Sequence, residues 1–461
     1  MSSNLQPVIV GAGPAGIRAA QTLVRHGLCP IVLDEASACG GQIYRQSPAG
    51  FERSAKALYG FEATRAASVH AAMNAIADHV DYRGGTLVWN AEGGELDLLQ
   101  GSRTTTVAYA QLIVATGATD RVLPFAGWTL PGVYSLGGAQ VALKFQACSV
   151  GERVAFVGTG PLLYLVAYQY AKAGAKVLAV LDSAGLGDQI AALPALLQQP
   201  AVLAKGLYYI AWLRAHGVPV HAGVRPVRAV GQTRVTALEW RDARGAHSLA
   251  CDAIAFGYGL RSETQLADIL GCRFVFDDLQ RAWLPERDSA GRASVGGVYL
   301  AGDGAGILGA DAAEWAGERA ALALLEDRGL ALDPDQRVRA ALLEEKLARQ
   351  RRLRGGLERA FPLPSDWAAQ ALDELVICRC EEVTAGDLRA TVRASGATEI
   401  NRLKALSRVG MGRCQGRMCS AAATEILAQC TGQPIAQSGR LRAQAPVKPI
   451  PFALAEPEES R

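Results

Sequence analysis

The sequence carries little net charge, and it lacks the long apolar run of a membrane-spanning helix. Its 461 residues include 47 Lys and Arg against 44 Asp and Glu, a net charge of +3 that predicts no nucleic-acid partner. No apolar run reaches the roughly 20 residues that a span needs, so we expect no transmembrane segment. Residues 1–7 are polar and do not resemble a secretory leader. We therefore expect a cytoplasmic chain, with peripheral attachment to the cytoplasmic membrane as the alternative.

Several patterns of catalytic residues are also missing. We find no Ser-His-Asp arrangement and no His-rich metal site, so the catalytic residues stay unknown. Cys39 stands alone near the N-terminal glycines, with no Cys-x-x-Cys or Cys-x4-Cys pair, which argues against a disulfide reductase. We expect Cys39 to be a small buried residue. Ten cysteines without a leader sequence point away from structural disulfides.

A glycine-rich turn joins a predicted strand at 8–10 to a predicted helix at 17–26. The G-x-G-x-x-G turn consists of Gly11, Ala12, Gly13, Pro14, Ala15 and Gly16. Its glycines allow a tight turn, close approach of a pyrophosphate and close packing of helix on strand, and the helix N-terminus attracts the phosphates. Asp34 and Glu35 end the next strand, where an acid binds a ribose hydroxyl. We expect a dinucleotide here, with Glu35 as the preferred ribose ligand.

Three further segments favour FAD over NAD. Gly41 and Gln42 lie where flavoproteins bring the backbone to the flavin, and Ala115-Thr116-Gly117 closes a strand as a second nucleotide contact. Gly302 and Asp303 lie at a strand–helix junction, where the acid can accept a hydrogen bond from the ribityl chain and the helix dipole faces the flavin.

As a set, these segments resemble the flavoprotein reductases with two dinucleotide domains. The resemblance implies an α/β fold whose Rossmann-like FAD-binding domain is discontinuous, spanning 1–120 and 286–330. It also implies a second nucleotide-binding-like domain, nested at 121–285.

The second glycine motif, Gly158-Thr159-Gly160, is incomplete because Leu163 replaces the third glycine. We expect this branched side chain to push the helix from the strand or to crowd a pyrophosphate. Asp182 ends the following strand without a basic pair behind it, which argues against a 2′-phosphate. We predict a nucleotide fold that packs but does not use NADH in turnover. An adenine nucleotide or a second flavin, bound here or at a subunit interface, stays open.

Four cysteines near the C-terminus form two tight pairs separated by 33 residues: Cys378 and Cys380, then Cys414 and Cys419. Four thiolates suffice for a [2Fe–2S] cluster, and the glycines around the second pair leave N–H groups free to bond the sulfurs. Zinc is the alternative, although zinc sites more often use Cys-x2-Cys. The remaining cysteines are predicted to be structural: Cys29, Cys148, Cys251, Cys272 and Cys430.

The segment 371–435 resembles the bacterioferritin-associated-ferredoxin-like [2Fe–2S] domain, which is small and α-rich. The phrases at 378–384 and 410–419 carry this resemblance. We expect a helical linker at 331–370 before this domain and an extended tail at 436–461 after it. An apolar insertion at 187–216 is predicted to be helical, and for it we favour core packing over partner docking.

The whole order resembles the larger electron-transfer subunit of heteromeric dye-linked dehydrogenases. This family acts on the C–N bond of amino acids, imino acids such as hydroxyproline, and opines, and it includes hydrogen cyanide synthase, octopine and nopaline oxidase and D-hydroxyproline dehydrogenase. The resemblance implies FAD, a [2Fe–2S] cluster, a glycine-oxidase-like flavoprotein partner and, in many members, a small iron–sulfur subunit. Electrons would pass to a quinone, a dye or another acceptor. A self-sufficient NAD(P)H-dependent FAD/[2Fe–2S] reductase is the alternative.

Overall fold

The computed structural model describes residues 5–48, 50, 51 and 53–451. Its first unit contains a five-stranded parallel sheet in the order β20 (Val298–Leu300), β7 (Leu112–Val114), β1 (Val8–Val10), β2 (Ile31–Asp34), β3 (Asp81–Gly84). Strands β1, β7 and β20 are buried along their whole length, as expected when both faces of a parallel sheet are covered. The strand β20 comes from a distant part of the chain, so the sheet is assembled from two separate segments.

Helices and a small sheet surround these strands. Helix α1 (Pro14–Arg25) packs against α9 (Ala310–Asp327), and at their crossing a Cβ at Gly317 would overlap the backbone of Ala15. Helices α2 (Ala55–Tyr59) and α3 (Ala63–Asn74) lie between β2 and β3 in the chain. An antiparallel sheet of β4 (Thr86–Glu92), β5 (Glu95–Gln100) and β6 (Arg103–Ala108) completes the unit.

The second unit repeats this plan. Its parallel sheet runs β12 (Val220–His221), β11 (Lys176–Asp182), β10 (Arg153–Thr159), β16 (Ala253–Tyr258), β9 (Val133–Ser135), beside the antiparallel strands β13 (Arg225–Gly231), β14 (Val235–Asp242) and β15 (Gly245–Ala250). Helices α4 (Leu136–Lys144) and α5 (Pro161–Lys172) pack against the parallel sheet. The two connections between the units, β8 (Ala118–Asp120) and β17 (Leu260–Ser262), pair with each other.

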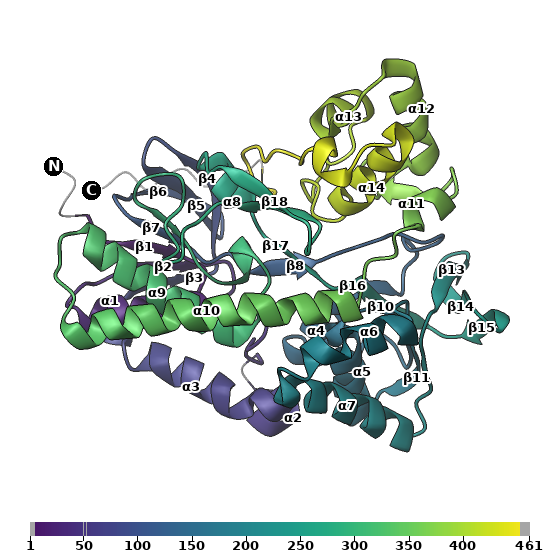
Figure 1. The fold of residues 1–461 in the computed structure, drawn as a ribbon, viewed down its shortest axis with the longest axis horizontal. Helices are drawn as coiled ribbons and strands as arrows, with labels where there is room; N and C mark the ends of the chain where they lie inside the picture. The colour runs from purple at the N-terminus through teal and green to yellow at the C-terminus, as the bar shows by residue number, and fades with distance from the viewer. Residues whose placement is uncertain (1–4, 49, 52, 452–461) are drawn as a thin grey trace.

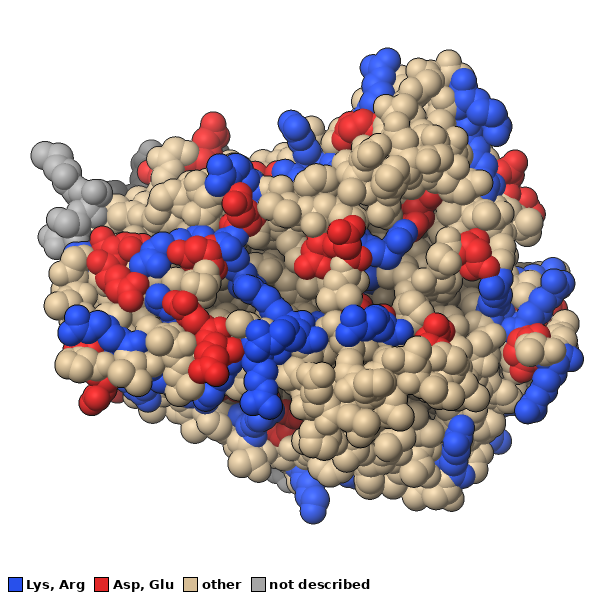
Figure 2. All heavy atoms as spheres, in the orientation of Figure 1, with Lys and Arg blue, Asp and Glu red and all other residues tan. Residues whose placement is uncertain are grey.

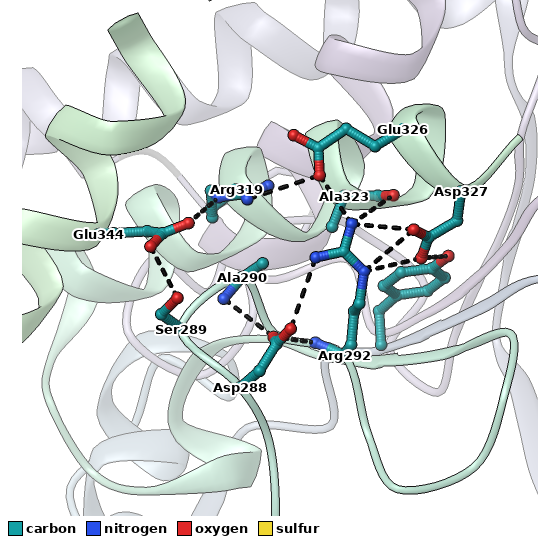
Figure 3. A network of polar contacts seen from close by, with 10 residues as sticks. Asp288, Ser289, Ala290, Arg292, Arg319, Ala323, Glu326, Asp327 and Glu344 are labelled. Atoms are coloured by element: carbon teal, nitrogen blue, oxygen red, sulfur yellow. Dashed lines mark hydrogen bonds and ion pairs between the residues drawn. The ribbon is translucent and has the colours of Figure 1, made fainter. Parts of the chain in front are cut away.

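The helix α10 (Pro334–Ala360) lies along both units and contacts α9 and α6 (Figure 1). Asp333 caps its N-terminus, because the Asp333 carboxylate accepts a hydrogen bond from the Gln336 N–H at 2.8 Å. Figure 3 shows the polar network that fixes the helix: Arg319 of α9 binds Glu344 of α10 at 2.7 Å, and Glu344 accepts from Ser289 at 2.6 Å. The network therefore joins α9, α10 and the loop before β20.

The apolar insertion forms α6 (Leu186–Leu196) and α7 (Pro200–Ala215), as its composition predicts. The prediction that this insertion packs in the core is wrong for α6, because Ala192 is its one buried residue. The side chains of Leu186 and Ile190 are 64% and 69% exposed. Helix α7 does bury Tyr209 and Leu213. The face around α5, α6 and α7 carries few charged side chains (Figure 2).

The C-terminal unit stands at the upper right of Figure 1. It contains α11 (Trp367–Gln370), β21 (Val376–Cys378), β22 (Val383–Thr384), α12 (Ala385–Ser395), α13 (Ile400–Ser407) and α14 (Ser420–Thr431). Two indole N–H groups fasten it to the second unit: Trp128 donates to the Val376 carbonyl at 2.7 Å, and Trp367 donates to that of Pro124 at 2.9 Å. Among the described residues, no helix combines the length and the apolar character needed to cross a membrane.

The tail after α14 returns to the first unit without forming a helix or strand beyond residue 438. Its Val447 N–H donates to the Trp89 carbonyl at 2.9 Å, and Lys448 pairs with Glu35. Of the extended tail predicted at 436–461, residues 436–438 belong to a short 3-10 helix, and 439–451 form neither helix nor strand. The rest of that prediction, 452–461, lies outside the described residues.

Candidate cofactor sites

The N-terminal glycine turn connects β1 to α1 and leaves room for a ligand at one glycine only. A Cβ at Gly11 would overlap the Ala115 carbonyl, and one at Gly16 would overlap that of Gly11. At Gly13 the nearest atom to such a Cβ is 3.7 Å away, and the backbone there is extended. Two glycines therefore serve close packing, while the space over Gly13 suits a pyrophosphate at the helix N-terminus.

The two acids after β2 have different roles. Asp34 accepts hydrogen bonds from the N–H groups of Ala12 at 2.5 Å and Ala36 at 2.7 Å, so it fixes the glycine turn. Burial raises the pKa of this carboxyl. The side chain of Glu35 is 59% exposed and pairs with Lys448 of the tail. Glu35 is therefore the acid whose position suits a ribose hydroxyl, and no sequence pattern indicated its lysine partner.

The Gly40–Gln42 segment packs directly on the glycine turn. The Gly40 N–H donates to the Ala12 carbonyl at 2.8 Å, and a Cβ at Gly41 would lie 2.9 Å from the Cα of Gly13. Gly41 has a φ of +63°, a value that favours glycine. The exposed Gln42 accepts from Arg45 at 2.9 Å. The backbone of this segment thus borders the space over Gly13, as predicted for a flavin contact.

The other two predicted FAD segments contact each other. A Cβ at Gly304 would lie 2.7 Å from the Thr116 hydroxyl, so the turn after β20 packs on the turn after β7. Asp303 accepts from the N–H groups of Leu308 at 2.9 Å and Gly309 at 3.0 Å, through one oxygen. It therefore shapes the loop leading into α9. Its other oxygen has no partner among the described residues and suits the predicted ribityl contact.

The second glycine motif differs from the first at its acid. Asp182 is fully buried and accepts from the hydroxyls of Thr159 at 2.8 Å and Tyr164 at 2.6 Å, and from the Ala184 N–H at 2.9 Å. Burial raises its pKa to about 6. Leu163 is also fully buried, in the core between α5 and its sheet, so it does not crowd the ligand face. Burial of the Asp182 carboxylate, rather than the size of Leu163, is therefore what makes this nucleotide fold differ from a ligand-binding one.

The four clustered thiols lie together in the C-terminal unit. Cys419 is within hydrogen-bonding reach of Cys378 and Cys414, and Cys414 is within reach of Cys380. In the described part of the chain, no three or more His, Cys, Asp or Glu side chains are arranged to hold a single metal ion. A [2Fe–2S] cluster needs only a pair of ligands on each iron. The row of thiols, in which Cys378 contacts Cys419, Cys419 contacts Cys414 and Cys414 contacts Cys380, suits that requirement.

Backbone N–H groups converge on the same sulfurs. The hydrogen bond with the Cys419 thiol lowers the pKa of Cys378 to about 6. The backbone N–H groups of Gly410, Cys380 and Glu381 act in the same direction. The Cys419 thiol and the N–H groups of Met418 and Gly416 lower the pKa of Cys414 to about 5. The contacts with Cys378 and Cys414 raise the pKa of Cys419, and burial raises that of Cys380, so the four thiols share their protons unequally. The backbone N–H groups that reach Cys378 and Cys414 suit iron–sulfur ligation.

The other cysteines fall into two groups. Cys39 is buried, as predicted, and so are Cys251 and Cys272. Cys29, Cys148 and Cys430 are exposed, so these three do not pack in the core, and the structural role predicted for them is wrong.

Sequence reasoning missed the residues that join the two cofactor sites. Glu263, which follows β17, is 8% exposed, and its backbone binds the Thr116 hydroxyl at 2.6 Å and the Gly117 carbonyl at 2.9 Å. Its carboxylate binds Arg417 at 2.7 Å, between Cys414 and Cys419. A charged residue inside the cysteine loop was the only available signal, because no motif surrounds Glu263.

The chain combines two Rossmann-like units, the first of which has an open glycine turn, with a unit that holds four thiols in contact. This combination defines a flavo-iron–sulfur oxidoreductase. The chain belongs to the pyridine nucleotide-disulphide oxidoreductase family, whose model matches residues 5–328. Residues 376–429 match the BFD-like [2Fe-2S] binding domain. The chain accordingly carries FAD and a [2Fe–2S] cluster, which settles the choice against zinc.

Similar proteins span almost the whole chain. The HcnB subunit of hydrogen cyanide synthase from Pseudomonas aeruginosa is 37% identical over 98% of this chain and 98% of its own length. An opine oxidase subunit from Agrobacterium tumefaciens is 35% identical over 97% of this chain and 90% of its own. The crystal structure of L-proline dehydrogenase from P. horikoshii has a TM-score of 0.72 and 20% identity, and covers 98% of this chain and 79% of that one. This structural match confirms the predicted fold class.

Proposed function

We propose that this chain is the electron-transfer subunit of a dehydrogenase that oxidises the C–N bond of an amino acid, imino acid or opine. Relatives that align over nearly the full length are subunits of hydrogen cyanide synthase and opine oxidase, which supports an assembly of several subunits. In this proposal a glycine-oxidase-like flavoprotein subunit supplies the electrons, and a small iron–sulfur subunit completes the complex. A quinone or dye accepts the electrons, in the cytoplasm or at the cytoplasmic membrane surface.

The buried state of Asp182 carries the proposal that electrons do not come from NADH. A nucleotide fold of this type binds the NADH ribose through an acid at this position. Here that acid already accepts hydrogen bonds from the hydroxyls of Thr159 and Tyr164 and from the Ala184 N–H. Moving it to a ligand would leave the two hydroxyls and the N–H without their acceptor, which costs about 1–3 kcal/mol for each.

FAD supplies two-electron chemistry and the cluster supplies one-electron chemistry, so a chain holding both can divide an electron pair. We propose that the FAD contacts are the residues 11–16, Asp34, Glu35, Gly41, Gln42, 115–117, Gly302 and Asp303. The cluster ligands would be Cys378, Cys380, Cys414 and Cys419. The domain division proposed here is 1–120 with 286–330, 121–285, a linker at 331–370, a cluster domain at 371–435 and a tail.

A self-sufficient NAD(P)H-dependent reductase is the second candidate. The open space at Gly160 favours it, because the atom nearest to a Cβ there is 3.8 Å away. An adenine nucleotide could therefore approach this turn even though Asp182 is occupied.

Anaerobic titration of the purified chain with NADH, and then with dithionite, separates the two candidates. For a relay subunit we expect NADH to leave the flavin bands unchanged and dithionite to bleach both the flavin and the iron–sulfur absorption. Bleaching by NADH within the mixing time would overturn the relay proposal in favour of the reductase. Thr159→Val combined with Tyr164→Phe, which removes two of the three hydrogen-bond donors to Asp182, is a matched variant. It should gain NADH reactivity if the buried acid is the obstacle.

A further inference from the structure

A cavity of about 120 Å³ lies between the first two units and the cluster unit. Arg121, which follows β8, and Arg261, in β17, line this cavity. Gln415, Gly416 and Ser420, from the loop of cluster cysteines and the start of α14, also line it. The cavity therefore borders the cluster loop directly.

The charged side chains of this cavity do not balance. Four arginines and two carboxylates line it. Arg281 pairs with Glu425 at 2.8 Å, and Arg440 pairs with Asp268 at 2.5 Å. Arg121 and Arg261 are left without a carboxylate partner among the described residues. Two nearby pairs, Arg417 with Glu263 and Arg354 with Glu358, are neutral within themselves. Cys414 and Cys419 face Arg261 and offset its charge when they are thiolates, so the uncompensated cation of the cavity is Arg121.

Both unpaired arginines are held in place through one nitrogen. Arg121 is 6% exposed, and its Nη2 donates to the Gln280 carbonyl at 2.8 Å. The Nη1 of Arg261 donates to the Ser420 hydroxyl at 2.8 Å and to the carbonyls of Gly416 and Arg417. The other guanidinium N–H groups have no partner among the described residues. Because a buried unpaired charge is costly and arginine stays protonated, this arrangement favours a bound anion.

We propose that this cavity is a binding site for a small oxyanion, a phosphate or carboxylate group, held by Arg121 and Arg261. The guanidinium fork matches either group through paired hydrogen bonds. Since Gln415 and Gly416 belong to the cysteine loop, the bound anion lies next to the cluster. Its negative charge disfavours the added electron, so occupancy lowers the reduction potential of the cluster.

Calorimetric titration of the FAD- and cluster-loaded chain tests the site, with inorganic phosphate in one series and acetate in the other, against chloride at equal ionic strength. We expect saturable binding of at least one oxyanion, and Arg121→Gln to weaken it about tenfold or more. Arg352→Gln, at an exposed position on α10, is the matched control and should leave the affinity unchanged. Arg121→Lys should recover part of the affinity, which excludes a folding defect as the cause.

The reduction potential of the cluster, followed by electron paramagnetic resonance, gives an independent readout. We expect the oxyanion that binds to lower the potential in the native chain and to have no effect in Arg121→Gln. Absence of saturable binding for both anions would overturn the proposal, leaving a water-filled cavity. Binding that Arg121→Gln does not weaken would overturn it as well, because the anion would then sit elsewhere. Neither result bears on the relay proposal, since no partner or NADH is used.

Discussion

Glu263 and Arg417 form a bidentate ion pair, with Nε to Oε2 at 2.7 Å and Nη2 to Oε1 at 3.1 Å. The glutamate backbone binds the turn after β7, a predicted FAD contact, and the arginine lies between two predicted cluster ligands. The Arg417 Nη1 also donates to the Cys414 carbonyl at 3.4 Å. Hydrogen bonds therefore run without a break from one cofactor site to the other.

The pair should tune the cluster in opposite directions when each charge is removed. Glu263→Gln leaves an uncompensated cation beside the cysteine loop, and we expect it to raise the reduction potential. Arg417→Gln leaves an uncompensated carboxylate and should lower it, because net charge near a cluster shifts its potential. Redox titration followed by electron paramagnetic resonance measures both shifts. The double variant should return toward the native potential, and shifts of the same sign in the two single variants would contradict this role.

Local pattern was enough for the elements and motifs near each cofactor. The strand Val8–Val10 was predicted with its observed bounds, since an apolar run before a glycine turn has few alternatives. Its helix begins at Pro14 rather than residue 17, because proline suits the first helical turn. Glu263 and Arg417 are 154 residues apart and belong to no motif, so only the fold could join them. For α6, apolar composition predicted a helix but could not tell which side faces solvent.

The glycine turn predicts two different outcomes for the same change of residue. Gly13→Ala fits the extended backbone and meets no atom within 3.7 Å, so the apoprotein should keep its stability but lose FAD affinity. Gly16→Ala would place its Cβ on the Gly11 carbonyl and should cost about 4 kcal/mol or more. Thermal unfolding of the apoproteins and flavin fluorescence titration measure the two effects. Unchanged FAD binding by Gly13→Ala would remove this turn from the cofactor site.

The neighbouring acids offer a second matched pair. Asp34→Asn loses an anionic acceptor of two backbone N–H groups and should destabilise the chain by about 1–3 kcal/mol. Glu35→Gln keeps the shape of an exposed side chain, so stability should change little while FAD affinity falls several-fold. Chemical denaturation and flavin titration of both variants check this division. Equal losses of stability would show that both acids serve the turn.

Each clustered cysteine should be required for the cluster but not for the flavin. We expect Cys414→Ala to lose the iron–sulfur absorption and about two irons per chain while retaining FAD. Cys430→Ala is the matched control, because this thiol is exposed and lies outside the two pairs. Visible spectra and iron analysis of both variants provide the measurement. A cluster that survives in Cys414→Ala would require another ligand.

The buried Asp182 should make the stability of the chain depend on pH in a defined window. Its pKa is about 6 in the folded chain, against 3.8 for an ordinary Asp, because burial disfavours the charged form. Folding therefore favours the protonated acid, and its stabilising effect is complete below pH 3.8. That effect is lost as the pH rises through about 6, a difference of roughly 3 kcal/mol.

Asp182→Asn cannot titrate, so the free energy of unfolding of the native chain, relative to this variant, should fall between these pH values and stay level above them. Urea unfolding across the same range measures the difference. A constant difference would mean that folding does not raise the pKa of Asp182, because the hydrogen bonds from Thr159 and Tyr164 would then compensate the burial of its charge.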